Sequence, residues 1–241
     1  MSSGQLKAYK EQMEIDYFAY FAKAYFAFNC YLKDKFSNHK KDRDKIDEMK
    51  RANSSRFTRL LEEDLFIQNL IELKNKLSNG LITNDNEPVY FEHVKIKSFQ
   101  DEEICKNQKH YKKTYYIKIL SNGRVIVRID NNGIIDCPYD EFENKLNNSS
   151  LTDTQKNIVR SYITNEINSY VKDITPLITK LSNKETLTDD EKKDIYRAFI
   201  EIIYSMRNGL FHSEIEPEND ETKSAYEKAY WLLREFVKKL S

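Results

Sequence analysis

The chain has few residues of the kinds that interrupt regular structure or crosslink a fold. Its 241 residues include five glycines, four prolines and three cysteines. Cys30, Cys105 and Cys137 are odd in number, widely spaced and without a CxxC pair. This usage argues against a disulfide framework or a zinc site and favours a reducing, cytoplasmic compartment. We find no internal repeat and no low-complexity tract.

The chain also lacks an excess of charge of either sign. Lys and Arg together number 39, as do Asp and Glu, so the formal net charge is zero. No global positive field would attract a polyanion, and any nucleic-acid site must be local. Hydrophobic residues make up 39% of the chain, which is enough for the core of one large domain or two small ones.

Targeting and cofactor motifs are missing as well. The first residues, MSSGQLKAYKEQ, contain no apolar signal core, and the apolar stretch from Tyr17 to Leu32 is interrupted by Lys23 and Asn29. That stretch is shorter than the roughly 20 residues that cross a bilayer, so we expect no membrane association. There is no HExxH, no dense carboxylate cluster and no Gly-rich phosphate loop. We therefore predict no metal and no cofactor, which disfavours a metallonuclease or an NTPase.

The N-terminal third predicts helices. Residues from Gln5 to about Phe36 contain no Gly or Pro, and their apolar positions recur near the helical period, which predicts one long helix. The run Ser37 to Ala52 is almost entirely polar and reads as a mobile linker or an exposed, frayed helix. A second helix is expected from Ser54 or Ser55 to Asn79-Gly80, a pair suited to a left-handed C-terminal turn.

The pattern then changes to alternation. Apolar residues alternate with polar ones around Val94, over 115–119 and over 125–129. Asn122-Gly123 and Asn132-Gly133 can both supply the positive φ of a tight hairpin, which predicts a three- or four-stranded antiparallel meander. A sheet this small must lie on helices or on a second subunit.

Helices resume after the meander. Thr152 with Gln155 and Thr188 with Glu191 are capping boxes that mark two helix starts, and Thr175-Pro176 kinks or restarts the first of these helices. The second runs into Arg207, and an acidic loop separates it from a last helix. The sequence therefore predicts a mainly α protein in which residues 1–241 form a single helical domain with a β-meander inserted at 87–139.

Between the last two helices lies the segment most suited to chemistry, Met206-Arg207-Asn208-Gly209-Leu210-Phe211-His212. An arginine holds phosphate with a planar fork of donors, and a histidine transfers protons near neutral pH. Five residues of helix turn by about 140°, so the two side chains would diverge in one copy. Gly209 could break the turn, and a two-fold axis would bring a second Arg207 and His212 to the same phosphate.

The Arg207-Asn208-x-x-x-His212 motif, together with a first helix reading IDYFAYFAKAYFAFN (Ile15 to Asn29), resembles the HEPN superfamily. The resemblance covers the helical parts of the chain and leaves the meander outside the common core. It implies a HEPN-type helical bundle and a homodimer with a composite site. Arg207 and His212 would be the catalytic pair of a metal-independent endoribonuclease, in a bacterial toxin or antiviral defence setting.

With RNA as the substrate, the neighbouring 2′-hydroxyl is the nucleophile and no metal-activated water is required. A second hypothesis is a non-catalytic HEPN module that serves as a dimerisation or RNA-binding partner of an effector or antitoxin. A third, with weak support, is an enzyme regulated by modification of Tyr226 or Tyr230. An isolated histidine near a helix end and an isolated surface arginine are more often structural, so the resemblance carries much of the weight.

Other residues are weaker candidates. Asn208 is expected to orient the motif, and Asn29, polar within an apolar stripe, is a candidate to face the site from across the bundle. The meander contains basic residues interleaved with aromatic ones, a composition that suits single-stranded RNA. Its candidate RNA-binding residues are Lys106, Lys109, Tyr111, Lys112 and Lys113. The simpler interpretation is an edge loop whose lysines prevent aggregation.

Overall fold

Two compact units make up the chain. The computed structural model describes residues 16–52, 54–96, 104–110, 112–120, 123–130, 132–168 and 171–240. Contacts group Met1–Val94 with Asp173–Ser241 in a helical unit, and Lys95–Lys172 in a second unit. Most of the regular structure is helical, which confirms the prediction of a mainly α protein. The second unit begins later than the predicted insertion at 87–139 and extends beyond it by two helices.

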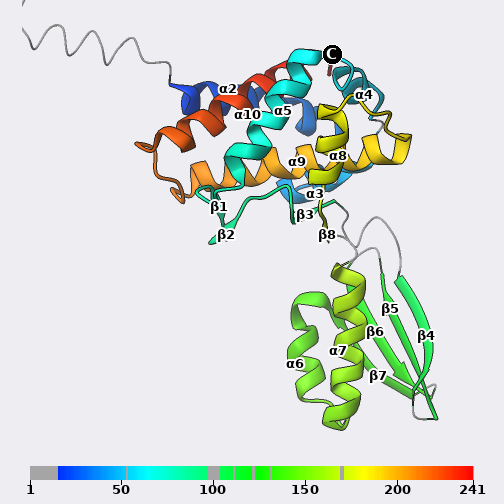
Figure 1. The fold of residues 1–241 in the computed structure, drawn as a ribbon. Coiled ribbons are helices and arrows are strands. Elements are labelled where there is room, and N and C mark those ends of the chain that lie inside the picture. The colour runs from blue at the N-terminus through cyan, green and yellow to red at the C-terminus, as the bar shows by residue number, and fades with distance from the viewer. Residues whose placement is uncertain are drawn as a thin grey trace, which may run out of the picture. The chain divides into compact units, whose positions relative to one another are not determined.

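Long helices dominate the helical unit (Figure 1). Its helices are α2 (Tyr17–Lys35), α3 (Asp42–Arg51), α4 (Ser55–Leu60), α5 (Asp64–Leu77), α8 (Thr175–Ser182), α9 (Asp189–Phe211) and α10 (Asp220–Lys238). Its short strands are β1 (Thr83–Asn84) and β2 (Glu87–Pro88), and β3 (Val94–Lys95) lies where the chain enters the second unit. Helix α10 packs against α2 and α5, while α3 and β1 pack against α9. The predicted first-helix residues 5–15 lie outside the described residues.

Aromatic rings fill the centre of the helical unit. Phe57 lies 5.1 Å from Phe199 and 5.8 Å from Phe236 between ring centroids, and Phe66 lies 6.2 Å from Phe199. The structure breaks the predicted second helix between α4 and α5, so that prediction is wrong in part. Phe57 and Phe66 are nine residues apart and would point to opposite sides of one continuous helix. The break lets both rings reach Phe199.

Two buried tyrosines tie helices together by donating to backbone carbonyls. Tyr196 donates to the carbonyl of Met49 and Tyr226 to that of Met206, each at 2.7 Å. Burial raises the pKa of both phenols well above the ordinary value, so they remain donors at physiological pH. Tyr226 is fully buried, which argues against it as a site of covalent modification, whereas Tyr230 is half-buried and stays a candidate.

Helix α3 contradicts the prediction of a linker or exposed helix over residues 37–52. Its residues Lys45, Ile46, Asp47, Met49 and Lys50 are buried. Glu201 of α9 accepts from Arg43 at 2.6 and 3.0 Å and from Lys50 at 2.8 Å. Asp47 lies 2.8 Å from Arg43 and 3.1 Å from Lys50. The polar run therefore folds because its charges are paired against a carboxylate on another helix, a long-range match that composition does not reveal.

The two carboxylates of this cluster are held in their charged form. Burial alone would raise the pKa of Glu201, but the charges of Lys50 and Arg43 outweigh it and hold that pKa below its usual range. The pKa of Asp47 is lowered in the same way, with burial opposed by Arg43 and Lys50. The stabilisation is therefore complete above the ordinary carboxyl pKa and is lost as the pH falls through the lowered values.

The second unit is a four-stranded antiparallel meander with helices on one face. Its strands, β4 (Ile104–His110), β5 (Lys113–Ile119), β6 (Arg124–Ile129) and β7 (Asn132–Pro138), pair in sequence order. They are followed by η1 (Tyr139–Glu141), α6 (Phe142–Asn147), α7 (Asp153–Asn168) and β8 (Val171–Lys172). Alternate strand residues pack with Phe142, Leu146, Val159 and Ile163 in one hydrophobic core. The meander thus lies on helices, as predicted.

Most turns and helix caps lie at the residues predicted from the sequence. Gly80 and Gly123 have φ values of 72° and 80°, and the side chains of Thr152 and Thr188 cap their helices as predicted. Asn132-Gly133 is not a turn, because both residues belong to β7. Among the described residues of that hairpin, Asp130 has a positive φ, at 50°, and a bulge lies in the β6–β7 pairing between Val127 and Arg128.

We predict that Glu201→Gln destabilises the helical unit by about 3–5 kcal/mol, because it removes one of the two carboxylates that the buried Lys50 and the partly buried Arg43 share. Chemical denaturation monitored by circular dichroism measures the change. In the parent, the free energy of unfolding should fall as the pH drops below about 4, and this fall should be shallower in the variant. Glu63→Gln removes an exposed partner of Lys239 and should cost less than about 1 kcal/mol. Equal effects of the two substitutions would contradict the prediction.

Candidate functional site at the end of α9

The Arg207 to His212 motif ends helix α9. The helix continues without a break through Phe211, and His212 is its C-cap. Glu214 donates its amide to the carbonyl of Gly209 at 2.9 Å, and Ser213 adopts a φ of 60°. This hydrogen bond and the left-handed residue are those of a Schellman ending. The suggestion that Gly209 breaks the turn is therefore wrong.

Gly209 serves a close approach between backbones. It is buried, and a Cβ added to it would lie 2.2 Å from the carbonyl oxygen of Thr83 in β1. The same strand is fixed to the motif by the Thr83 hydroxyl, which donates to the carbonyl of Glu214 at 2.9 Å. A residue without a side chain is required here because a backbone oxygen cannot move aside as a flexible side chain can.

Arg207 has an unusual environment for a cation. Its guanidinium carbon lies 5.6 Å from the ring centroid of Tyr25 on α2 and 4.9 Å from that of Phe211. Nη1 donates to Oδ1 of the buried Asn208 at 2.9 Å, whereas Nε is buried without a hydrogen-bond partner. Within the described part of the chain, no carboxylate forms an ion pair with Arg207. Aromatic faces hold this cation in place and leave donor capacity unused.

Tyr25 does not act as a counterion for Arg207. Burial raises the pKa of Tyr25 well above its ordinary value, and the charge of Arg207 opposes that shift only in part. The phenol is therefore neutral at physiological pH and offers its ring face, as Phe211 does. Sequence reasoning placed Tyr25 in the core and gave Phe211 no role. A signal for Phe211 was present, because it lies four residues after Arg207 and so on the same helix face.

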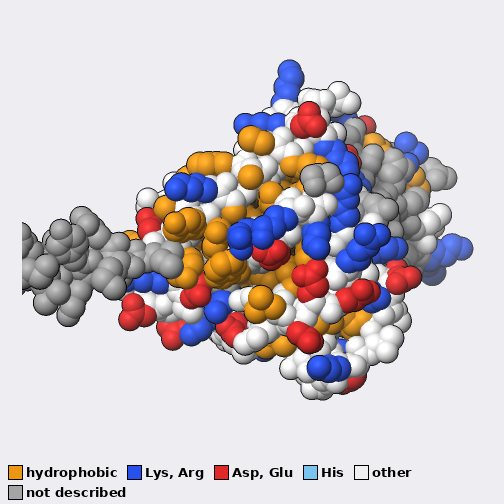
Figure 2. Space-filling model, turned by 90° about the horizontal axis from the view of Figure 1, so that it is seen from above, with side chains coloured by type: hydrophobic (Ala, Val, Ile, Leu, Met, Phe, Trp, Pro, Cys, Tyr) orange, Lys and Arg blue, Asp and Glu red, His pale blue; other side chains and the backbone are white. Residues whose placement is uncertain are grey.

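His212 is exposed to solvent at the helix end. On the continuous helix it lies about 140° around the axis from Arg207, so one copy of the motif does not converge on a single phosphate. Near Arg207 lies an exposed aromatic pair, Phe26 at 53% exposure and Phe211 at 43%, with ring centroids 5.9 Å apart. Figure 2 shows further hydrophobic side chains at the surface of the helical unit.

Asn208 and Asn29 were predicted as supporting residues. Asn208 is buried, and its side chain accepts from the guanidinium of Arg207, so it orients that side chain rather than the motif backbone or a helix cap. Asn29 is half-buried on α2, one helical turn beyond Tyr25. In the described residues no hydrogen bond joins Asn29 to Arg207 or His212, so its predicted place at the site stays a prediction.

The predicted RNA-binding residues of the meander do not form one patch. Lys109, Lys112 and Lys113 are exposed around the β4–β5 hairpin, and Lys112 has a φ of 65°. Strand alternation places Lys113 on the face of the buried Tyr115 and Lys109 on the opposite face. Lys106 pairs with Ile117, but its side chain lies outside the described residues, as does Tyr111.

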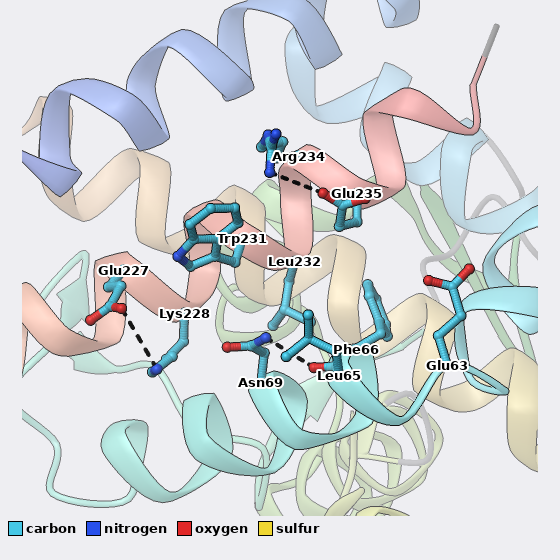
Figure 3. A pocket seen from close by; sticks show the side chains of 10 residues that line it. All are labelled: Glu63, Leu65, Phe66, Asn69, Glu227, Lys228, Trp231, Leu232, Arg234 and Glu235. Carbon is cyan, nitrogen blue, oxygen red and sulfur yellow. Dashed lines mark hydrogen bonds and ion pairs between the residues drawn. The ribbon is translucent and has the colours of Figure 1, made fainter.

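A separate cavity of about 450 Å³ lies between α5 and α10 (Figure 3). Its lining residues are Glu63, Leu65, Phe66, Asn69, Glu227, Lys228, Trp231, Leu232, Arg234 and Glu235. The cations beside it are neutralised within the chain, since Lys228 pairs with Glu72 at 2.8 Å and Arg234 with Glu235 at 3.2 Å. Neither Arg207 nor His212 lines this cavity, so it is not part of the motif site.

The described residues contain neither a metal-binding cluster nor a membrane-spanning helix. No group of three or more His, Cys, Asp or Glu side chains in that part of the chain is placed to hold a metal ion. No helix there is long and apolar enough to pass through a membrane.

We predict that Gly209→Ala destabilises the helical unit by about 1–3 kcal/mol, because the new Cβ displaces β1 from α9. Helix propensity alone would stabilise the Ala variant by about 1 kcal/mol. A net loss of stability would therefore show that the close contact with Thr83 outweighs helix propensity. Gly133→Ala is the control, since nothing lies within 4 Å of its added Cβ and its φ is not positive. Thermal melting of both variants measures the difference, and a Gly209→Ala protein as stable as the parent would refute the account.

Comparison with known proteins leaves the motif geometry as the basis for a functional assignment. No protein-family model matches the chain, and no curated protein or solved structure shows significant similarity to it.

Proposed function

We propose that this chain is a HEPN-type, metal-independent endoribonuclease that acts as a homodimer, in the cytoplasm, within a bacterial toxin or antiviral defence system. The observation that carries the proposal is the state of Arg207. It is a cation held by Tyr25, Phe211 and Asn208, with a buried Nε that has no acceptor. A buried donor without a partner costs about 1–3 kcal/mol. Because Nε is enclosed, a phosphate would meet the guanidinium first through its Nη donors, and a small turn of the side chain would then let the planar fork hold two phosphate oxygens.

The proposal requires two copies because the geometry of one copy diverges. Arg207 and His212 point about 140° apart on a continuous helix. A two-fold axis near the end of α9 would place both histidines and both arginines around one phosphate. The exposed rings of Phe26 and Phe211 beside the motif supply apolar surface for such a contact.

The proposed reaction needs only groups that the dimer and the RNA supply. One His212 imidazole accepts the proton of the 2′-hydroxyl as the 2′-oxygen bonds to phosphorus. Arg207 stabilises the negative charge that collects on the phosphorane oxygens. The bond from phosphorus to the 5′-oxygen then breaks, and the second His212 donates a proton to that oxygen. The products are a 2′,3′-cyclic phosphate and a free 5′-hydroxyl.

The second candidate is a non-catalytic HEPN module that dimerises or binds RNA for a separate effector or antitoxin. It is favoured by the same exposed pair, Phe26 and Phe211, which would serve docking whether or not chemistry follows. The two candidates differ at His212, because docking through the aromatic pair does not use an exposed imidazole. Substitution of that residue separates them.

We predict that the parent is a dimer at micromolar concentration and that Phe26→Asp makes it a monomer with at least about 100-fold less cleavage, because a charge would be buried in the contact. Sedimentation velocity and a cleavage assay measure the two effects. Leu65→Asp is the control, since Leu65 is 71% exposed but lies on α5 beside the separate cavity. It should leave both mass and cleavage unchanged. A fully active monomeric parent would exclude the composite site.

We predict that His212→Ala lowers cleavage at least about 100-fold while the dimer and the melting temperature are retained, because the imidazole transfers protons and is exposed. Arg207→Lys should be severely impaired as well, because an ammonium lacks the planar fork. The assay uses assorted RNAs with a chelator present, and the products should carry 2′,3′-cyclic phosphate ends. Strict dependence on a divalent metal, or equal cutting of DNA, would defeat the mechanism. Retained activity in His212→Ala would favour the non-catalytic module.

A further inference from the structure

The sheet of the second unit has one covered face and one open face. Tyr115, Ile117 and Ile119 of β5 are buried in the core shared with α6 and α7. Successive strand residues point to opposite faces, so the residues between them form the other face. We call these the open sheet face. Its described members are Asn107, Lys109, Thr114, Tyr116, Lys118, Arg124, Ile126, Arg128, Gly133, Asp136 and Pro138.

An aromatic residue lies at the centre of the open sheet face. Tyr116 pairs across the strands with Asn107 on one side and Arg128 on the other. The guanidinium carbon of Arg128 lies 5.6 Å from the centroid of the Tyr116 ring. Directly opposite Arg128 on β7 is Gly133, and an added Cβ there would meet nothing within 4 Å. In the cross-strand row of Asn107, Tyr116, Arg128 and Gly133, no side chain therefore covers Arg128 from β7.

Cations surround this row. Lys109 lies in the next row toward the hairpin, and Lys118 lies in the next row on the other side of Tyr116. Among the described strand residues of this face, Asp136 is the carboxylate, and Arg124 binds it at 2.8 Å. The described strand residues of this face therefore carry more cations than carboxylates, although the whole chain has a net charge of zero. This is the local positive surface that a neutral chain needs if it binds a polyanion.

We propose that the open sheet face binds single-stranded RNA, with a base stacked on Tyr116. Lys109, Lys118 and Arg128 contact the phosphates on either side of that base. A single strand is specified because its base faces are accessible to an aromatic ring, whereas a duplex stacks its bases internally. The choice of RNA rather than DNA rests on the proposed function. This surface replaces the lysine cluster predicted from sequence, whose members Lys109 and Lys113 lie on opposite faces.

The test measures the affinity of the full-length chain for a fluorescent, single-stranded oligouridine of about 12 nucleotides by anisotropy. Its riboses are 2′-O-methylated, so attack by the 2′-oxygen cannot cleave it. Tyr116→Ala should weaken binding by about fivefold or more, and Tyr116→Phe, which keeps the ring, should bind within about twofold of the parent. Duplex RNA of the same length should bind more weakly than the single strand.

The phosphate contacts are tested by the salt dependence of binding. Replacing Lys109, Lys118 and Arg128 by Ala together should reduce the slope of log affinity against log salt by about 2, since each lost phosphate contact removes about 0.7. The charge-matched control replaces Lys145, Lys156 and Arg160 of α6 and α7, and it should leave the slope unchanged. Tyr139→Ala, at another exposed tyrosine of the second unit, is the control for the ring.

Several results would overturn the proposal. These are unchanged affinity in Tyr116→Ala, equal slopes in the two triple variants, tighter binding of duplex RNA, or tighter binding of single-stranded DNA. Circular dichroism and melting of each variant confirm that the second unit is folded, and Tyr116→Phe tests the ring if Tyr116→Ala is unstable. Because the probe cannot be cleaved, binding can be measured even if the protein has no nuclease activity. If the protein cleaves RNA but does not bind the probe through the open sheet face, this inference is wrong and the proposed function still stands.

Discussion

The carboxylate of Glu201 is the point at which the helical unit is held in register. It is buried on α9, and both of its oxygens are taken by cations from α3, Arg43 and Lys50. Separating the carboxylate from these cations would leave an unpaired charge in the interior, so a shift of α3 along α9 would cost free energy. Glu201 lies six residues before Arg207, on the same uninterrupted helix. An interaction that fixes α9 therefore also fixes the position of the motif at its end.

Backbone contacts also fix the position of α9 near its C-terminal end. Gly209 allows the carbonyl of Thr83 to lie against α9, and the Thr83 hydroxyl binds the carbonyl of Glu214 just beyond the helix. Tyr226 of α10 also donates to the carbonyl of Met206. Arg207 is thus carried by a segment with little freedom to move. If Arg207 binds a phosphate as proposed, such preorganisation would help to hold the two at a defined distance.

Local signals predicted much of the fold. Capping boxes, Gly80 and Gly123 marked element ends, because the chemistry of each lies within a few residues. The predictions were wrong where the structure of a segment depends on a residue far away in the sequence. The sequence of α3 is too polar to predict packing, but Glu201, 151 residues after Lys50, pairs with the cations of this helix. The break before α5 depends on Phe199 receiving two rings from one predicted helix. Neither partner can be identified from the local pattern.

The candidate site shows the same division between local and distant information. The motif and the orienting contact of Asn208 with Arg207 are adjacent in sequence and could be predicted. The cage around Arg207 could not, since Tyr25 reaches it from α2. Helical geometry, a local rule, still has a consequence for function. A continuous α9 separates Arg207 from His212 by about 140°. The proposed enzyme therefore relies on a second copy to complete its site, and the exposed Phe26 and Phe211 are the surface that we propose for that contact.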